Sequence, residues 1–290
     1  MTDRPTEPRR FDMRDLAGRR WPVPDWHLEK IAAEMAEAEP RGRMMGVVRR
    51  IPHQAAPDFS ALDWDAELAA FEGIEYPTYY TQPFHSVPGG YLSEAAAEGD
   101  RAAMEAIYHE AHPRRSLGMR EELAALVPDD ARVVVDLGGG TADAGAALAR
   151  RLPEARVLSI DASPFMTIAG RHQNADLPNL RIEQGFAEST GLDDASVDAV
   201  TITLVFHECP DKIKDTILAE VRRILRPGGR LVLSDTPQDD LHSFRGFYEP
   251  YKEQWLRFEP EACVARAGFV DGSLRSVAPP LWTVVAHKPA

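Results

Sequence analysis

The chain has 290 residues, of which 44% are hydrophobic and 27% charged, a composition typical of a globular protein with one large domain or two unequal ones. Its formal net charge of −13 supplies no basic field to hold a phosphate backbone, so we expect a small-molecule partner and no nucleic acid. It also lacks an apolar run long enough to cross a bilayer, which excludes an integral membrane protein.

The first 20 residues contain two prolines, several acidic residues and no apolar core, so we expect a mobile leader over 1–20, no signal peptide and a cytoplasmic protein. Cys209 and Cys263 are the two cysteines, and their spacing fits neither a disulfide framework nor a zinc site. The sequence does not fix the oligomeric state, and a homodimer is left open.

Residues 21–115 are predicted to form a helical and irregular N-terminal cap or lid. Apolar periodicity predicts helices over 25–39, 64–71 and 93–112, the last interrupted at Gly99-Asp100. Between them, residues 76–91 contain three prolines, a Gly-Gly pair and five aromatic residues, which exclude a regular element. This aromatic loop is either a cap on a ligand pocket or a satellite core.

The pattern changes near residue 116. Helices are expected over 117–127, 141–152, 164–173, 211–225 and 260–267. Strands are expected over 132–136, 156–160, 180–184, 197–205 and 229–235, then near 269–277 and 281–287. Alternating strands and helices with short connections predict a parallel α/β sheet over residues 116–290.

The stretch VVVDLGGGTADAG, residues 133–145, is a strand that turns through glycines into a helix. Such turns occur in dinucleotide enzymes as well as in methyltransferases, so the glycines alone do not discriminate. Asp136 precedes the first glycine by two residues, and Asp143 stands where GxGxxG requires its third glycine. A carboxylate there suits a cationic amino-acid group better than a pyrophosphate. Asp161 ends the next strand, where it can accept hydrogen bonds from ribose hydroxyls.

Four motifs in order resemble the class I S-adenosylmethionine-dependent methyltransferases, in particular the methyltransferase-11 group that includes quinone-biosynthesis enzymes. They are VVVDLGGGTADAG, VLSIDASPFMTIAG, GFAESTGLDDASVDAVTITLVFHECP and ILRPGGRLVLSD. The resemblance implies a Rossmann-like sheet of seven strands, mostly parallel with an antiparallel C-terminal strand. It also implies S-adenosylmethionine as the cofactor and a substrate-wall insertion around 236–257.

The resemblance also implies a set of cofactor-binding residues. They are Asp136, Gly138, Gly139, Gly140, Asp161, Ala162, Phe186, Ala187 and Leu204. Phe186 departs from the family, which commonly has an acidic residue there to bind the adenine amino group, so adenine is held either by apolar contact or by a neighbour such as Glu188. A looser likeness relates PFHSVPGGYL, residues 83–92, to a PFHxxxxGxL-type motif of uncharacterised methyltransferases, which suggests that the N-terminal part belongs to the active site.

Methyl transfer depends mostly on alignment of the acceptor with the sulfonium carbon, and an acidic acceptor also needs a base. FHECP places His207 and Glu208 at the carboxyl edge of the sheet, where open α/β sheets bind their ligands. We therefore expect His207 to be the base and Glu208 to orient it, against the alternative that both serve the structure only. No Asn/Asp-Pro-Pro-Tyr/Phe motif follows, so methylation of nucleic-acid bases lacks its usual signature.

Several aromatic residues and histidines outside these motifs are candidates for substrate contact, with packing as the competing explanation. They are Tyr80, His85, Tyr108, His109, His112, Phe247 and Tyr251. The pair His109 and His112 lacks a third ligand in register, so we predict no metal.

The leading interpretation is methyl transfer from S-adenosylmethionine to the oxygen or carbon of a small aromatic or polyketide-like metabolite. A non-catalytic methyltransferase-fold module that still binds the cofactor is one alternative. An NAD(P)-dependent oxidoreductase is another, and it is disfavoured because GxGxxG and a YxxxK-type pair are absent.

Overall fold

The computed structural model describes residues 9–10, 29, 58–87, 89–100, 104, 118–238, 248–278 and 281–290. Several predictions fall outside this part of the chain. They are the leader apart from Arg9–Arg10, nearly all of the helix expected over 25–39, and the candidate substrate contacts Tyr108, His109, His112 and Phe247.

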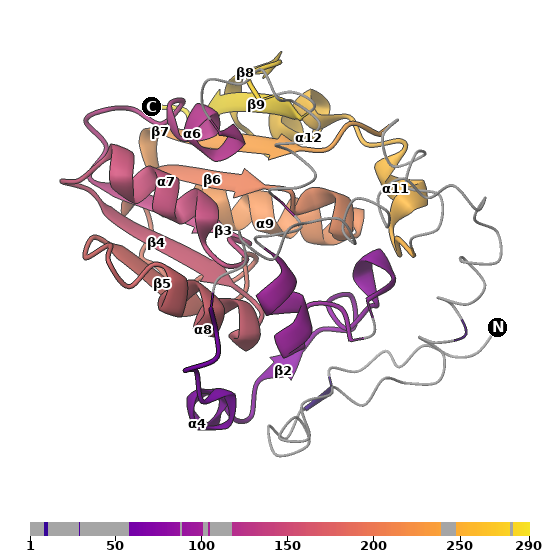
Figure 1. Cartoon of the computed structure of the whole chain (residues 1–290). Helices are drawn as coiled ribbons and strands as arrows, with labels where there is room; N and C mark the ends of the chain where they lie inside the picture. The colour runs from indigo at the N-terminus through magenta and orange to yellow at the C-terminus, as the bar shows by residue number, and fades with distance from the viewer. Residues whose placement is uncertain are drawn as a thin grey trace.

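A seven-stranded sheet forms the centre of the molecule (Figure 1). Its strands are β3 (Val133–Leu137), β4 (Arg156–Asp161), β5 (Leu180–Gln184), β6 (Val197–Thr203), β7 (Leu225–Asp235), β8 (Val270–Arg275) and β9 (Trp282–His287). Their order is β5-β4-β3-β6-β7-β9-β8, and β9 runs antiparallel to both of its neighbours while β3 to β7 are parallel. The predicted Rossmann-like fold with an antiparallel C-terminal strand is confirmed.

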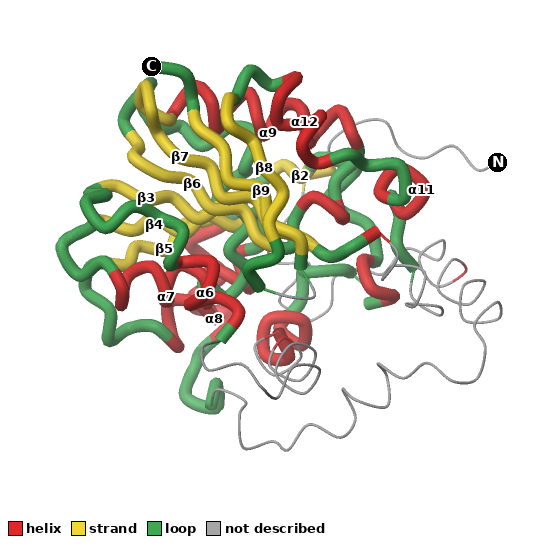
Figure 2. The backbone as a smooth tube through the Cα atoms, turned by 90° about the horizontal axis from the view of Figure 1, so that it is seen from above, coloured by secondary structure: helices red, strands yellow, loops and turns green. Residues whose placement is uncertain are grey.

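Helices cover both faces of this sheet (Figure 2). One face carries α6 (Met119–Ala124), α7 (Asp143–Arg151) and α8 (Pro164–Gln173), and the other carries α9 (Asp211–Ile224) and α12 (Pro260–Arg266). Because both faces are covered, the central strands are mostly apolar, and all seven residues of β6 are buried, Asp198, Thr201 and Thr203 among them. No described helix combines the length and the apolar character that crossing a bilayer requires.

Some element boundaries differ from the sequence prediction for local backbone reasons. The helix expected from residue 141 begins at Asp143, because Ala142 has a left-handed backbone with φ of 63°. Likewise β6 ends at Thr203, because Leu204 is left-handed with φ of 59°. Strand β7 begins at Leu225, earlier than expected, and pairs with Val197 across a register shift.

The N-terminal part of the described chain packs on α8. It contains α4 (Trp64–Leu68), the 3-10 helix η2 (Ala69–Phe71), β2 (Glu75–Tyr76), which pairs with β1 (Arg9–Arg10), and η3 (Phe84–Ser86). Trp64, Tyr76 and Leu92 join Phe165 and Ile168 of α8 in one apolar cluster. Residues 94–100 are helical without a break, so the interruption expected at Gly99-Asp100 does not occur within them.

The described part of the segment after β7, where an insertion was expected around 236–257, contains α11 (Lys252–Trp255). Trp255 is fully buried and stacks on Phe258, with ring centroids 5.0 Å apart, so this part of the insertion is core. The Tyr251 hydroxyl donates to the Tyr79 carbonyl at 3.3 Å. The insertion and the aromatic loop are thus in contact, and both lie beyond the arrowheads of the parallel strands in Figure 1.

Candidate active site

Four adjacent parallel strands end at the same edge of the sheet, and each delivers a polar side chain there. Asp161 ends β4, Asp136 lies near the end of β3, and Asp235 ends β7. His207 follows β6 in the 3-10 helix η4 (Phe206–Glu208). The edge therefore carries three carboxylates and an imidazole in neighbouring positions.

The glycine turn after β3 needs glycine for both conformation and space. Gly138 has φ of 67°, and its N–H donates to the Ile160 carbonyl at 2.8 Å. A Cβ atom at this position would lie 2.5 Å from Cγ2 of Val205, so a side chain would strain the backbone and also clash. The turn is therefore held tightly between β4 and the segment after β6.

Asp136 lies beneath this turn rather than on its open side. Its side chain is buried and accepts hydrogen bonds from Thr201 at 2.8 Å and Ser159 at 3.1 Å. A Cβ atom on Gly139 would come within 2.7 Å of its Oδ2 atom. Burial raises the pKa of Asp136, and the Thr201 hydrogen bond opposes that rise. In this structure Asp136 positions the turn, and contact with a cofactor stays a prediction.

Asp161 is held by two main-chain donors at the open side of the turn. Oδ2 accepts from the Gly140 N–H and Oδ1 from the Ser163 N–H, both at 2.8 Å. Each carboxylate oxygen keeps capacity for a further donor. Burial raises the pKa of Asp161 to about 6, and the two main-chain hydrogen bonds only partly offset this effect.

Asp100 borders the glycine turn, although no sequence pattern predicts it there. Its Oδ2 atom accepts from the Thr141 hydroxyl at 3.0 Å and would lie 3.5 Å from a Cβ atom on Gly140. Burial raises the pKa of Asp100, whereas the nearby charge of Arg120 on α6 lowers it. The turn is thus bordered by an acidic and a basic side chain from two different helices.

The segment after β5 carries the expected adenine neighbours. Phe186 and Ala187 are partly buried, and Phe186 makes an edge contact with the Tyr76 ring, with centroids 5.9 Å apart. Glu188 accepts a hydrogen bond from the Tyr79 hydroxyl at 2.6 Å. Both ways of holding adenine, apolar contact with Phe186 and a hydrogen bond to Glu188, stay predictions, because Glu188 keeps acceptor capacity beside its bond to Tyr79.

His207 is buried, and Asp235 orients its ring. Nδ1 of His207 lies 2.7 Å from Oδ1 of Asp235, while Oδ2 of the same carboxylate accepts the main-chain N–H of Phe206 at 2.8 Å. Because the other described contacts of Asp235 come from N–H donors, Nδ1 of His207 acts as the donor here. Its Nε2 atom is therefore the one directed at Glu208, 3.5 Å from Oε1.

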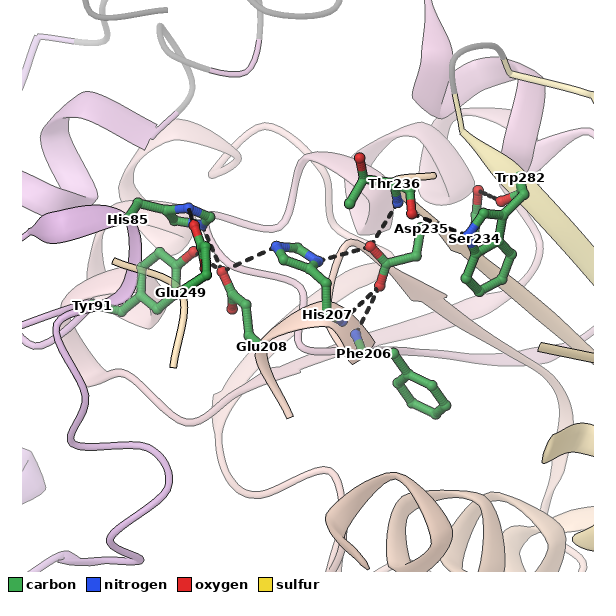
Figure 3. A network of polar contacts seen from close by, with 10 residues as sticks. All are labelled: His85, Tyr91, Phe206, His207, Glu208, Ser234, Asp235, Thr236, Glu249 and Trp282. Atoms are coloured by element: carbon green, nitrogen blue, oxygen red, sulfur yellow. Dashed lines mark hydrogen bonds and ion pairs between the residues drawn. The ribbon is translucent and has the colours of Figure 1, made fainter. Parts of the chain in front are cut away.

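Glu208 connects His207 with the N-terminal loop (Figure 3). Its Oε1 atom lies 2.7 Å from Nε2 of His85 and also accepts the Tyr91 hydroxyl. Nδ1 of His85 in turn lies 2.5 Å from Oε1 of Glu249, which lies in the segment between β7 and α11. Two imidazoles and three carboxylates therefore alternate in one chain of contacts.

The electrostatics of this cluster are dominated by burial and by its carboxylates. Burial lowers the pKa of His207, but Asp235 raises it by more, so the pKa is raised overall. Burial also lowers the pKa of His85, and Glu249 and Glu208 together raise it well above its ordinary value. The cluster thus favours positive charge on or between its imidazoles.

The structure brings together some of the predicted substrate contacts. His85 lies in the cluster with His207 and Glu208, and its backbone is left-handed with φ of 53°. Tyr80 packs among Tyr76, Tyr79 and Phe84, and Tyr251 is buried against the aromatic loop. The loop is thus a packed aromatic cluster that also delivers His85 to the sheet edge.

Asp235, Tyr91 and Glu249 were not selected as site residues from the sequence, although they complete the network. Asp235 had a usable signal, because it ends the strand next to the one that precedes His207. Glu249 had none, since only the tertiary fold brings it to His85.

The chain is similar to known methyltransferases in sequence. Residues 134–229 match the family model described as a methyltransferase domain. A trans-aconitate 2-methyltransferase of Deinococcus radiodurans is 38% identical over 140 residues, which cover 48% of this chain and 51% of that protein. A demethylmenaquinone methyltransferase of Thermus thermophilus is 35% identical over 126 residues, covering 43% and 56%. The chain spans about half the length of these curated relatives.

Solved methyltransferase structures share the fold. Human N-acetylserotonin methyltransferase in complex with S-adenosylmethionine has a TM-score of 0.55 at 14% identity, covering 90% of this chain and 70% of that one. Phosphoethanolamine N-methyltransferase 2 of Haemonchus contortus has a TM-score of 0.52 at 14% identity, covering 74% and 62%. These structures show the fold alone, whereas the family match over residues 134–229, the curated relatives and the strand order together support a class I S-adenosylmethionine-dependent methyltransferase.

The residues present fit this cofactor better than a dinucleotide. Asp100, Asp161 and Asp143 surround the turn, and this acidic setting would repel a pyrophosphate. It suits a sulfonium and an ammonium group, and Asp161 has the remaining acceptor capacity that ribose hydroxyls need. The oxidoreductase interpretation is therefore not supported.

Proposed function

We propose that this protein transfers a methyl group from S-adenosylmethionine to an oxygen or carbon of a small, aromatic or polyketide-like acceptor. One observation carries the proposal: the glycine turn after β3, and the buried His207 with the partly buried Glu208 after β6, occupy neighbouring strand ends of one sheet edge. A methyl donor bound at the glycine turn would therefore lie beside His207 and Glu208, the groups proposed to bind the acceptor and take its proton.

The chain's own residues account for each part of the cofactor. Asp161 would accept the ribose hydroxyls, and Phe186 with Ala187 would contact the adenine. Asp100 would hold the ammonium of the methionine part, and Arg120 its carboxylate. When bound, the cofactor supplies an electrophilic methyl group, so the protein's part is to align the acceptor with it.

His207 is the proposed base for an acceptor that loses a proton. Its Nδ1 atom is occupied by Asp235, so Nε2 is the atom able to accept a proton, and Asp235 stabilises the resulting cation. Asp235 is in this sense a positioning residue. Glu208 faces Nε2 and helps to orient the ring.

The acceptor class is supported by the surroundings of the site. The aromatic loop, with Tyr80, and the insertion, with Tyr251, would supply flat apolar walls for the acceptor. Two relatives are named for a quinone and for a small carboxylic acid as acceptors. The net charge of −13 argues against a nucleic-acid acceptor.

The test is release of S-adenosylhomocysteine in the presence of small hydroxylated aromatics, quinones and polyketides. We expect acceptor-dependent release by the wild type and loss of at least 100-fold in His207→Ala. Wild-type turnover by His207→Ala would remove the base assignment. Cofactor binding without release for any acceptor class would favour the non-catalytic module.

A further inference from the structure

The strongest unassigned feature is the way donor atoms converge on Glu208. One ring nitrogen of His85, one ring nitrogen of His207 and a carboxylate oxygen of Glu208 all lie within 4.8 Å of one another. His85 and Glu208 are 123 positions apart in the sequence, so no local spacing rule reveals the group. We propose that His85, His207 and Glu208 bind a divalent transition-metal ion.

The outer contacts of both histidines match those of metal-bound imidazoles. Nδ1 of His207 is held by Asp235 and Nδ1 of His85 by Glu249, and both carboxylate side chains are buried. A metal-ligating histidine usually donates its other ring nitrogen to a carboxylate in this way, which fixes the tautomer and turns the remaining lone pair toward the metal.

With each Nδ1 acting as donor, both Nε2 lone pairs face the Glu208 oxygen. Lone pairs in such contact need a positive charge between them, either protons or a metal ion. Nε2 of His85 is 2.7 Å and Nε2 of His207 is 3.5 Å from Oε1 of Glu208. Two ligand atoms that each lie about 2.1 Å from one metal ion are about 3.0–3.4 Å from each other. The two nitrogen-to-oxygen distances lie just below and just above this range.

Charge balance also favours a cation. Glu208, Asp235 and Glu249 contribute three carboxylates against two imidazoles, and among the described residues no lysine or arginine makes an ion pair with them. Oε2 of Glu249 is buried and has no hydrogen-bond partner within the described part of the chain. This oxygen is a further hydrogen-bond acceptor without a described donor, and it belongs to the carboxylate that contacts the proposed ligand His85.

The ligand types indicate which metals fit. Two imidazoles and one carboxylate with open positions suit iron(II), and imidazole ligands also suit zinc. The role of this ion in catalysis rests on the proposed methyl transfer. Its open coordination positions would bind an acceptor that presents two neighbouring oxygens, such as a hydroxyl beside a carbonyl. In the metal-bound protein such an ion lowers the pKa of a bound hydroxyl, and this activation takes the place of proton transfer to Nε2 of His207, which is then a ligand.

The test uses the full chain without an affinity tag, treated with chelator and then titrated with Zn²⁺ by calorimetry and with Co²⁺ by absorption. We expect one ion per chain with micromolar or tighter affinity and a visible Co²⁺ band. The isosteric Glu208→Gln should weaken binding at least 100-fold, and Glu249→Gln, which removes the negative charge of an outer contact, by about 10–100-fold.

His172→Ala is the matched control, because this exposed histidine bonds the Asp58 carbonyl outside the cluster and its loss should not change metal affinity. Circular dichroism checks that each variant is folded, and His85→Ala gives a second ligand deletion. Affinity weaker than about 100 μM in the wild type, or unchanged affinity in both Glu208→Gln and His85→Ala, would overturn the proposal. Neither measurement needs S-adenosylmethionine, so failure here leaves the methyl-transfer proposal intact.

Discussion

Asp161 is the residue whose chemistry most directly controls cofactor binding. It is buried, it keeps acceptor capacity beside two main-chain donors, and its pKa is raised by burial to about 6. Above that pH the side chain is an ionised acceptor for the ribose, and below it the carboxyl is protonated and loses that charge.

We therefore predict that the dissociation constant for S-adenosylmethionine increases as the pH falls through about 6, by up to tenfold for each further pH unit. Calorimetry between pH 5 and 8 measures this dependence. Asp161→Asn should bind weakly with little change over the same range. A wild-type affinity that does not vary with pH would show that ionised Asp161 does not hold the cofactor.

The residues of this edge were predictable to different degrees. Asp161 and His207 could be found from the sequence because each follows an apolar strand, and parallel strands end together. Asp100 could not, because the pattern around Gly99 suggests a helix break, whereas the helix continues and presents Asp100 to the glycine turn.

Among the elements, the turn between β3 and α7 is the most constrained. Gly138 combines a left-handed backbone with a side-chain clash against Val205. Gly228 has a similar φ of 75°, but a methyl group added there would meet no atom within 4 Å. An alanine at Gly228 would therefore suffer backbone strain alone, whereas an alanine at Gly138 would suffer both backbone strain and a steric clash.

Gly228→Ala is predicted to destabilise the protein by about 1–2 kcal/mol, the cost of a left-handed alanine. Gly138→Ala should cost about 1–3 kcal/mol more, because Val205 is stiff and cannot move away easily. Urea unfolding of both variants measures the difference. Equal losses would mean that the turn has room for a methyl group.

The order and type of the sheet elements followed from the sequence, because buried parallel strands form continuous apolar runs. Their ends were less predictable. Leu204 and Ala142 adopt left-handed backbones although neither is a glycine, and propensity gives no sign of this. Both positions lie beside the glycine turn or the strand ends that form the site.

For the whole molecule, the site is assembled from segments far apart in the chain. Residues 58–100 contribute His85, Tyr91 and Asp100, and the segment after β7 contributes Glu249. The two segments also contact each other, through Tyr251 and Tyr79. The sequence alone predicted that these regions surround a site, but not their contacts, which depend on tertiary packing of aromatic side chains on α8.

The central claim is that the acidic turn binds a sulfonium cofactor, and one calorimetric experiment tests it. S-adenosylmethionine and S-adenosylhomocysteine are titrated into the wild type and into Asp161→Ala, with NAD and NADP as control ligands. We predict micromolar binding of the first two ligands, weakening of about 100-fold in Asp161→Ala, and no binding of NAD or NADP. Binding of NAD in preference to S-adenosylmethionine, or equal binding by Asp161→Ala, would contradict the account.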